Sequence, residues 1–474
     1  MIRTLTLATC LLLVALPGCE RGQMPEVPAV DVGEAEPRVA AHLTALRKAV
    51  LAHPDSAEAW GRLALNLQTH GHTEAAAQAY AAARNEAPES FPYHYLPAVM
   101  HAERGDERAG ELFASARELR PDYSPLYLRE AEWHLADGRP AEARRLLEEP
   151  AAPADFPATM LLLGRAALAT GDTTEARRQL ETAVGRAPRY GEAHAQLAEL
   201  YRRGGDEERA ELARARAEAF DSRPELEDPV YALVAREGVS ARWHIVRAQS
   251  QLAAGRPEAA IEELREAVEI APDDAHAVHL LGTALEQAGR LNQAIEQYRR
   301  ALEIRPVFRE AELNLSRALF RTGAREDATR HVREVLSADS SVAEAYLLLG
   351  MFEQAAGRPG QASRVYATGL RNATFDRHLA IRLAWILATS SDPALRNGQQ
   401  AVALAERVNA VESFTDPASL DALAAAYAEY GDFPRAVAAA RRGIGLAREA
   451  GNHQLAGAIE RRLARYESSR PYRE

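Results

Sequence analysis

The sequence repeats itself at a period of about 34 residues, which restricts the chain to a small set of repeat folds. The clearest unit, residues 275–306, carries small residues and one aromatic residue at fixed positions. One such unit cannot bury its apolar face alone, so adjacent units are expected to stack. In this unit the positions are Gly282, Gly289, Ala294, Tyr298, Ala301 and Pro306; the spacing returns at Gly71, Ala76, Tyr80, Ala83 and Pro88, at Gly164, Gly171, Ala176, Leu180, Ala183 and Pro188, and at Gly255, Ala260, Leu264, Ala267 and Pro272.

Each recurring residue type predicts one feature of a helical hairpin. The small residue Gly282 lets the two helices of one hairpin approach closely, and Gly289 ends the first helix where a left-handed conformation is needed. Ala294 stands where a larger side chain would overlap the partner helix, while Tyr298 is expected to fill the gap to the neighbouring unit. Because Pro306 cannot continue a helix, it sets the turn into the next unit.

These positions resemble the tetratricopeptide repeat (TPR) pattern, and the resemblance covers nearly all of the chain after residue 36. It implies an all-α fold, a right-handed α-solenoid of about ten stacked helix hairpins. A lone second helix at residues 37–52 is expected to cap the stack. Clear hairpins are predicted to begin near Ala57, Pro157, Gly191, Ala241, Ala275, Arg309 and Ala343.

The period lapses between Asp221 and Val239, where Pro224 and Pro229 interrupt a polar stretch. We interpret this lapse as a joint between two subarrays. The last hundred residues resemble the closing repeat pair of many large bacterial TPR proteins, followed by a final helix from Asn452 to Tyr466. The predicted organisation after residue 36 is an N-terminal subarray at 37–220, a joint at 221–239, a central subarray at 240–374 and a C-terminal module with its capping helix at 375–474.

The amino terminus predicts a lipid anchor. A short apolar run from Leu5 to Leu16 follows Arg3 and leads into Leu16-Pro17-Gly18-Cys19, which resembles a bacterial lipobox. The resemblance implies cleavage of a signal peptide at 1–18 and lipidation of Cys19, although Pro17 departs from the usual small or aliphatic residue. Two alternatives are a secretory signal that is cleaved elsewhere and an uncleaved anchor. Residues 19–36 are rich in Pro, Gly, Val and acid, and predict a flexible tether.

Composition excludes several classes of function. The formal net charge is −11, which argues against nucleic acid as a general partner. The cysteines Cys10 and Cys19 both precede the repeats, so the body has no disulfide, cysteine-ligated zinc or thiol nucleophile. Because Lys48 is the only lysine, the lysine–asparagine clamp of some chaperone-binding TPR domains has no counterpart in the repeats.

The first helix of each TPR hairpin lines the concave surface, so the resemblance predicts which residues form a groove. In the central subarray these residues are both cationic and apolar, a combination that suits an extended peptide or a partner helix. The alternative is that they are solvated groove residues of a kind that every solenoid has. The predicted partner-binding residues are Arg242, Ile245, Gln249, His276, His279, Glu310, Leu313, Arg317, Phe320, Leu347 and Met351.

No catalytic or phosphate-binding motif appears in the sequence, and neither cofactor nor metal is predicted. His276 and His279 share a helical face, but no third metal ligand is evident from spacing. The leading hypothesis is therefore a non-enzymatic, membrane-tethered scaffold of the bacterial cell envelope that binds other proteins and faces the periplasm or the outside. One alternative is a solute- or glycan-binding protein that uses Trp243, Tyr346 or His279 for stacking. Another is a non-catalytic subunit of an envelope enzyme complex.

Overall fold

The computed structural model describes residues 26–30, 36–221, 223–224 and 226–474, and the regular structure of these ranges is helical. Consecutive helices pair as antiparallel hairpins, and this arrangement confirms the predicted α-solenoid. The first part of the chain comprises α1 (Pro37–Ala52), α2 (Ala57–Thr69), α3 (Thr73–Glu86), α4 (Phe91–Ala102), α5 (Arg108–Leu119), α6 (Ser124–Ala136), α7 (Pro140–Leu147), α8 (Pro157–Ala169), α9 (Thr173–Arg186), α10 (Gly191–Arg203) and α11 (Glu207–Ala219).

The short helix α12 (Ala232–Glu237) separates these hairpins from the second part of the chain. A 3₁₀ turn (Pro393–Leu395) lies within the loop of the first C-terminal hairpin, whose helices end at Thr389 and begin again at Gly398. The remaining helices are α13 (Ala241–Ala253), α14 (Pro257–Ile270), α15 (Ala275–Gln287), α16 (Leu291–Ile304), α17 (Arg309–Arg321), α18 (Arg325–Ala338), α19 (Ala343–Ala355), α20 (Pro359–Asn372), α21 (Arg377–Thr389), α22 (Gly398–Val411), α23 (Pro417–Tyr430), α24 (Phe433–Glu449) and α25 (His453–Glu467).

The predicted hairpin starts coincide with the observed ones. Helices α2, α8, α10, α13, α15, α17 and α19 begin at the seven residues that the repeat pattern indicates, and α1 is the expected capping helix. Residues at the helix ends explain where the helices begin and end. Asp274 accepts hydrogen bonds from the first backbone N–H groups of α15, whereas Gly289 has a φ of 78° just after the end of the same helix.

The small residue of the first helix allows close packing within a hairpin, as predicted. A Cβ atom on Gly282 would lie 2.6 Å from Tyr298 Cε1. The prediction for Tyr298 is contact with the neighbouring unit, and the structure adds contacts within its own hairpin. The ring of Tyr298 packs on Gly282 of its own hairpin, and its hydroxyl donates to Glu286 Oε2 of the same hairpin at 2.9 Å. The tyrosine therefore holds the two helices of one unit together.

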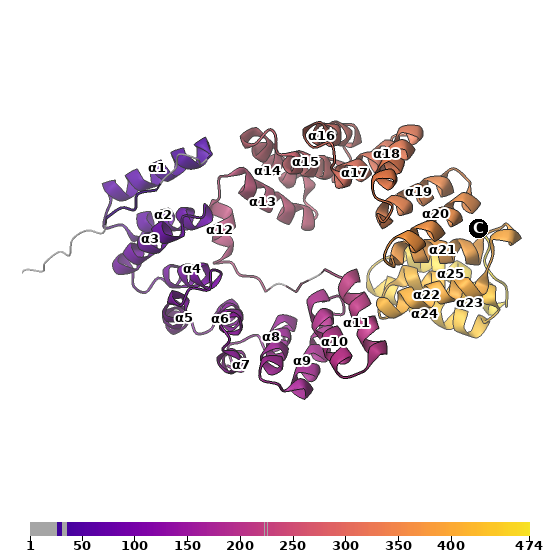
Figure 1. Cartoon of the computed structure of the whole chain (residues 1–474), viewed down its shortest axis with the longest axis horizontal. Helices are drawn as coiled ribbons and strands as arrows, with labels where there is room; N and C mark the ends of the chain where they lie inside the picture. The colour runs from indigo at the N-terminus through magenta and orange to yellow at the C-terminus, as the bar shows by residue number, and fades with distance from the viewer. Residues whose placement is uncertain (1–25, 31–35, 222, 225) are drawn as a thin grey trace, which may run out of the picture.

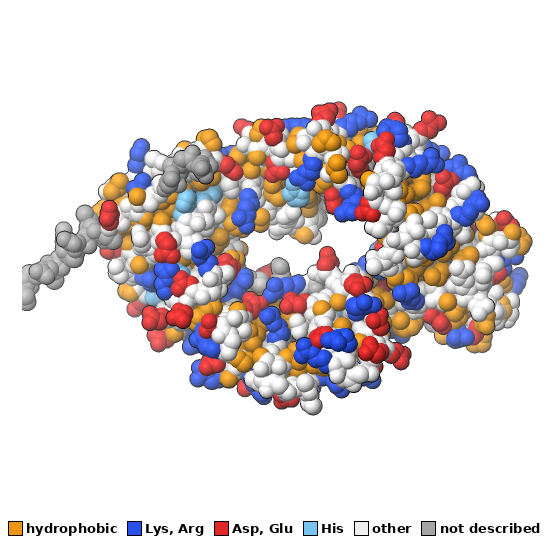
Figure 2. Space-filling model, in the orientation of Figure 1, with side chains coloured by type: hydrophobic (Ala, Val, Ile, Leu, Met, Phe, Trp, Pro, Cys, Tyr) orange, Lys and Arg blue, Asp and Glu red, His pale blue; other side chains and the backbone are white. Residues whose placement is uncertain are grey.

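The two halves of the solenoid form an elongated ring around a central opening (Figures 1 and 2). The hairpins α2–α11 occupy one side, and α13–α20 occupy the other. In hairpins such as α4–α5, α6–α7, α13–α14 and α15–α16, the first helix lies nearer the opening than the second (Figure 1). The concave surfaces of both halves therefore face one lumen.

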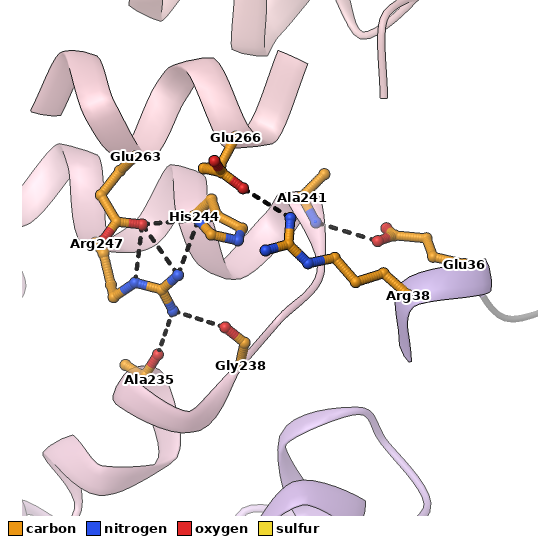
Figure 3. A network of polar contacts seen from close by, with 9 residues as sticks. All are labelled: Glu36, Arg38, Ala235, Gly238, Ala241, His244, Arg247, Glu263 and Glu266. Carbon is orange, nitrogen blue, oxygen red and sulfur yellow. Dashed lines mark hydrogen bonds and ion pairs between the residues drawn. The ribbon is translucent and has the colours of Figure 1, made fainter. Parts of the chain in front are cut away.

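Contacts between the halves close the ring at both ends. At one end, Arg38 of α1 pairs with Glu266 of α14 at 2.7 Å, and Glu36 accepts a hydrogen bond from the backbone N–H of Ala241 (Figure 3). At the other end, Arg216 of α11 donates to the carbonyls of Ala410 and Val411, at 2.8 and 3.1 Å. The two halves of the ring are thus joined by tertiary contacts as well as by the chain.

A second set of contacts fixes the start of the second half (Figure 3). Arg247 of α13 donates to the carbonyls of Ala235 and Gly238, at 3.0 and 2.7 Å, and so holds the end of α12. The same guanidinium pairs with Glu263, which also lies 2.8 Å from His244 Nδ1. Hydrogen bonds from Arg247 and His244 outweigh the effect of burial and lower the pKa of Glu263. Helix α12 packs against α2, which belongs to the first half.

Residues 221–231, which we call the strap, lead from the end of α11 back to α12. The strap follows the inner side of the first half and contacts α4 and α6 on the way. This path lies within the segment predicted as a joint. The strap thus returns across the concave surface of the hairpins that precede it, a path that the prediction of a joint did not include.

The predicted signal peptide and Cys19 lie outside the described residues. Within the predicted tether, Val27 and Val30 pack against the core that α1, α2 and α3 share, so this part of the tether is docked on the first hairpins. Among the described residues, no helix has both the length and the apolar character needed to cross a bilayer.

Candidate protein-binding surfaces

The inner surfaces of α13, α15, α17 and α19, here called the second groove, carry the residues predicted to bind a partner. Most of them are available to solvent, but two are not. Leu313 is 2 % exposed and belongs to the core, and His279 is 8 % exposed. Arg242, Gln249, His276, Glu310 and Met351 are exposed, and Ile245, Arg317, Phe320 and Leu347 are half-buried.

The predicted cationic element of this groove is already paired with carboxylates. Glu286 of α15 accepts from Arg317 at 3.4 Å and from Arg321 at 3.0 Å. Arg317 also pairs with Glu344 at 3.7 Å and contacts Asn314 Oδ1. The centre of the second groove is therefore an ion-pair network whose charges largely cancel.

Two predicted residues contribute to packing within the groove. Phe320 stacks on Phe352, with ring centroids 4.1 Å apart. The Nε2 atom of His279 lies 2.8 Å from Asn314 Nδ2, and its ring packs on Phe308. Burial, with a smaller contribution from the charge of His276, lowers the pKa of His279 to about 4. His279 is therefore neutral near pH 7.

The residues proposed for stacking on a sugar do not present open ring faces. Trp243 is half-buried and donates its Nε1–H to Thr69 O at 2.8 Å. Tyr346 is 7 % exposed, and its hydroxyl oxygen accepts from Asn372. His279 is buried as described above. These positions do not favour the glycan-binding alternative.

One group of side chains has the composition of a metal site. Glu312, His331 and Glu334 place one potential ligand atom each within 4.8 Å of one another. His331 Nδ1 lies 2.7 Å from Glu312 Oε2 and 3.5 Å from Glu334 Oε2, so these groups already pair with one another. They stand on α17 and α18, and His276 and His279 are not among them.

A cleft of about 740 Å³ lies where the end of the first half meets the C-terminal module. The sequence did not indicate this cleft. We call it the junction cleft. Phe220, Ile381 and Trp385 give it apolar surface, and Leu347 connects it to the second groove. Its titratable lining residues are Arg189, Arg377, His378, Arg382, Glu412, Asp416, Asp421 and Arg462.

The carboxylates of the junction cleft all have partners. Arg462 donates two hydrogen bonds to the carboxylate of Asp421, at 2.8 and 2.5 Å. Arg377 lies 3.7 Å from Glu412. Asp416 accepts from the backbone N–H of Ser419 at 2.7 Å, which caps α23. Arg382 is exposed and pairs with no carboxylate of the described chain. The cleft therefore offers a cation to an incoming group while its acids are engaged.

Sequence reasoning missed this cleft because its residues are far apart in the chain. Arg189 precedes α10, Arg382 lies on α21 and Arg462 lies on α25. No repeat spacing relates them, since ring closure brings them together. Of the predicted partner-binding residues, Leu347 alone lines the cleft.

Part of the repeat array matches a known family. Residues 161–224, 231–275, 245–307 and 279–341 match the model of the tetratricopeptide repeat family. These segments are tetratricopeptide repeats. The TPR hairpins of the matched segments include α8 to α11 and α13 to α18, and the hairpins before and after them have the same two-helix architecture.

Several solved structures resemble this chain at low identity. Yeast Tom70 is 14 % identical, with a TM-score of 0.41, and the match covers 85 % of this chain and 95 % of Tom70. MamA is 18 % identical, with a TM-score of 0.24, over 44 % of this chain and 94 % of MamA. PilF of Pseudomonas aeruginosa is 20 % identical, with a TM-score of 0.25, over 45 % and 90 %. No curated protein shows significant sequence similarity to the chain.

Proposed function

We propose that this protein is a non-enzymatic scaffold, tethered to a membrane of the bacterial cell envelope, that binds an acidic segment of a partner protein. The segment binds in the junction cleft and extends into the second groove. TPR proteins generally mediate contacts between proteins, and the family match supports a function of this class. The observation that carries the proposal is Arg382, which has no carboxylate partner among the described residues and stands in a cleft whose own carboxylates are engaged.

The chemistry of the cleft favours a peptide with both acidic and apolar side chains. Arg382 can form a charge-assisted hydrogen bond with a carboxylate, and such bonds are shorter and stronger than neutral ones. Apolar surface from Trp385 and Ile381 lies in the same cleft, which can receive an aliphatic or aromatic anchor. Because Leu347 of α19 lines the cleft and also belongs to the second groove, a segment longer than the cleft would run on along the inner surface of α19.

The membrane tether is part of the proposal and rests on the amino-terminal sequence. The lipobox-like Leu16-Pro17-Gly18-Cys19 follows a short apolar run, as a lipoprotein signal requires. Docking of Val27 and Val30 on the first hairpins leaves only a short stretch of chain between Cys19 and the ring. A lipid on Cys19 would therefore hold the ring close to the membrane surface, facing the periplasm or the outside.

Capture of partners after cross-linking in cells tests the proposal. We expect the wild-type protein to yield a reproducible protein partner. The charge reversal Arg382→Glu should reduce recovery of that partner at least tenfold, whereas Arg371→Glu on α20 should leave it unchanged. Arg371 is also exposed, and it donates to Thr368 of its own helix. Recovery of the protein alone, or equal recovery by both variants, would contradict the proposal.

A further inference from the structure

The strap contacts the inner surfaces of α4, α6 and α8, here called the first groove, in the way that a bound peptide would. At its centre the Asp228 carboxylate accepts hydrogen bonds from Tyr95 Oη and Tyr123 Oη, each at 2.6 Å. Three residues later the ring of Tyr231 lies under the guanidinium of Arg129, 4.7 Å from the ring centroid. These contacts recognise a carboxylate and an aromatic ring at a fixed spacing.

Contacts on either side of Asp228 extend this recognition. Arg223 pairs with Glu132 of α6 at 2.6 Å, and the Tyr231 hydroxyl donates to Glu103 at 2.5 Å. Between them Leu226 packs against an apolar cluster that includes Leu128 and Leu162. The first groove thus distinguishes a cation, an aliphatic side chain, an acid and an aromatic ring in this order along the strap.

The groove side of these contacts is buried and closely packed. Tyr95 is 0 % exposed and Tyr123 is 6 % exposed, and both rings pack against Phe91. Burial, and secondarily the charge of Asp228, raises the pKa of Tyr95 far above its usual value, so its hydroxyl remains a donor at neutral pH. Because the two hydroxyls are positioned by packing, binding a carboxylate there costs little conformational entropy.

The strap side of these contacts is much less buried. None of the described strap residues is buried, and Arg223, Glu227 and Pro229 are exposed. Pro224 and Pro229 favour extended backbone at the residue before each of them. A cavity of about 500 Å³ remains between the strap and the first groove, where Leu128, Phe156 and Ala158 contribute to its lining. The strap therefore fills the groove only in part.

We propose that the first groove is a second partner-binding site and that the strap is an intramolecular occupant which the partner replaces. The partner is a protein with an extended segment of the same chemistry. Its acidic residue binds Tyr95 and Tyr123, an aromatic residue three positions later lies under Arg129, and an aliphatic residue two positions earlier fills the cavity beside Leu128. This site is separate from the junction cleft and does not depend on it.

The strap belongs to the same chain as the first groove, so a partner must compete with a high local concentration of the strap. A segment joined to its own site by short flexible chain has an effective concentration in the millimolar range. A free segment with the strap's own contacts is therefore mostly excluded from the wild-type protein. A substitution that weakens binding of the strap and leaves the first groove unchanged should therefore raise the affinity of this groove for a free peptide. This expectation can be tested directly.

The test measures binding of a fluorescein-labelled synthetic peptide with the sequence of residues 221–233 to the full chain. The variant Asp228→Ala removes the strap's central carboxylate and keeps both tyrosines. We expect it to bind the peptide at least tenfold more tightly than the wild-type protein does. Adding Tyr95→Phe and Tyr123→Phe to this variant should abolish the gain, and a peptide in which the same aspartate is alanine should not bind.

A second variant of the strap shows whether the result depends on the Asp228→Ala substitution alone. Arg223→Ala with Leu226→Ala alters only strap side chains and should also raise peptide affinity over that of the wild type. Equal affinity of the wild type and both strap variants would overturn the proposal, as would undiminished binding after loss of the two tyrosine hydroxyls. Circular dichroism and thermal melting confirm that each variant is folded before its affinity is compared.

Discussion

The ring of Tyr366 lies directly against Gly350, so that a Cβ atom on the glycine would be 2.1 Å from Tyr366 Cε1. The tyrosine hydroxyl donates at 2.7 Å to Gln354 Oε1, which lies four residues after the glycine on the same helix. Tyr80 and Gln68 form the same hydrogen bond, also at 2.7 Å. A glycine contact and a hydrogen bond thus fix one tyrosine to the first helix of its own hairpin.

The variant Gly350→Ala should destabilise the protein by about 1–3 kcal/mol, because the added methyl group has no room beside a fully buried ring. Gly185→Ala is the matched control. Gly185 also lies within a helix, but no atom lies within 4 Å of the position that its Cβ would take, so alanine should stabilise by about 0.5–1 kcal/mol. Urea denaturation measures both changes, and destabilisation of equal size would contradict the packing argument.

The variant Ala294→Arg should be destabilised by more than about 3 kcal/mol or fail to fold, because it forces a bulky charged group into a helix contact. Ala294 is 0 % exposed. Ala403→Arg on α22 places the same side chain at an exposed position and should change stability by no more than about 0.5 kcal/mol. Thermal melting compares the two, and an unchanged transition for Ala294→Arg would refute the repeat register.

The repeat pattern predicts local structure far better than it predicts the arrangement of the halves. Positions such as Ala275 and Gly289 have one physical role each within a hairpin, so their spacing locates helix starts and turns. Ring closure depends on single contacts between distant segments, such as Arg216 with Ala410, and no periodicity encodes these. The strap is visible in the sequence as a break in the pattern, but its path cannot be inferred from that break.

The sequence likewise predicts one part of the binding surfaces and not the other. Repeat positions identify residues on first helices, but they do not reveal which arginines are neutralised. The spacing predicts Arg317 as a cationic contact, yet Glu286 and Glu344 both pair with it. The spacing does not single out Arg382, although this residue has no carboxylate partner in the described part of the chain. Its importance depends on neighbours that only the folded ring brings together.

Stability should fall as the pH is lowered from 6.5 towards 4, in part because of His279. Its pKa is about 4 in the fold and 6.5 as the unperturbed value, so the unfolded state binds more protons in this window. Protonation of His279 in the unfolded state lowers the free energy of unfolding by at most about 3 kcal/mol over this pH range. His279→Gln keeps a hydrogen-bonding group and should reduce the loss. Denaturation measured at several pH values compares the two proteins; identical pH dependence would contradict this assignment.

Loss of the α11–α22 contact should open the ring. The double variant Arg216→Ala, Arg377→Ala removes three hydrogen bonds to carbonyls of Ala410, Val411 and Ala219. Bonds from charged donors contribute roughly 1.5–3 kcal/mol each. We expect a larger radius of gyration in small-angle X-ray scattering. Arg38→Ala, which removes an exposed pair worth no more than about 1 kcal/mol, should leave it unchanged. A compact double variant would refute this closure.

The substitution Cys19→Ser should prevent lipidation and shift the protein out of the membrane fraction. The reason is that acylation requires the thiol, and stable anchoring requires more than one acyl chain. Cys10→Ser is the control, because Cys10 precedes the expected cleavage site. Fractionation and intact-mass measurement report the outcome. An unchanged distribution, or a mature mass without acyl chains in the wild type, would refute the lipoprotein proposal.

Closure of the ring changes how unfolding can begin. In an open solenoid each repeat contacts only its neighbours, so the terminal repeats fray first and disorder spreads inward. Here α11 and α13, the inner ends of the two subarrays, are contacted by α22 and by the start of α1 respectively. The couplings between repeats therefore form a circle instead of a line. Unfolding that starts at α11 or α13 must first break one of these closures, so the repeats of the ring should unfold more cooperatively than those of an open solenoid.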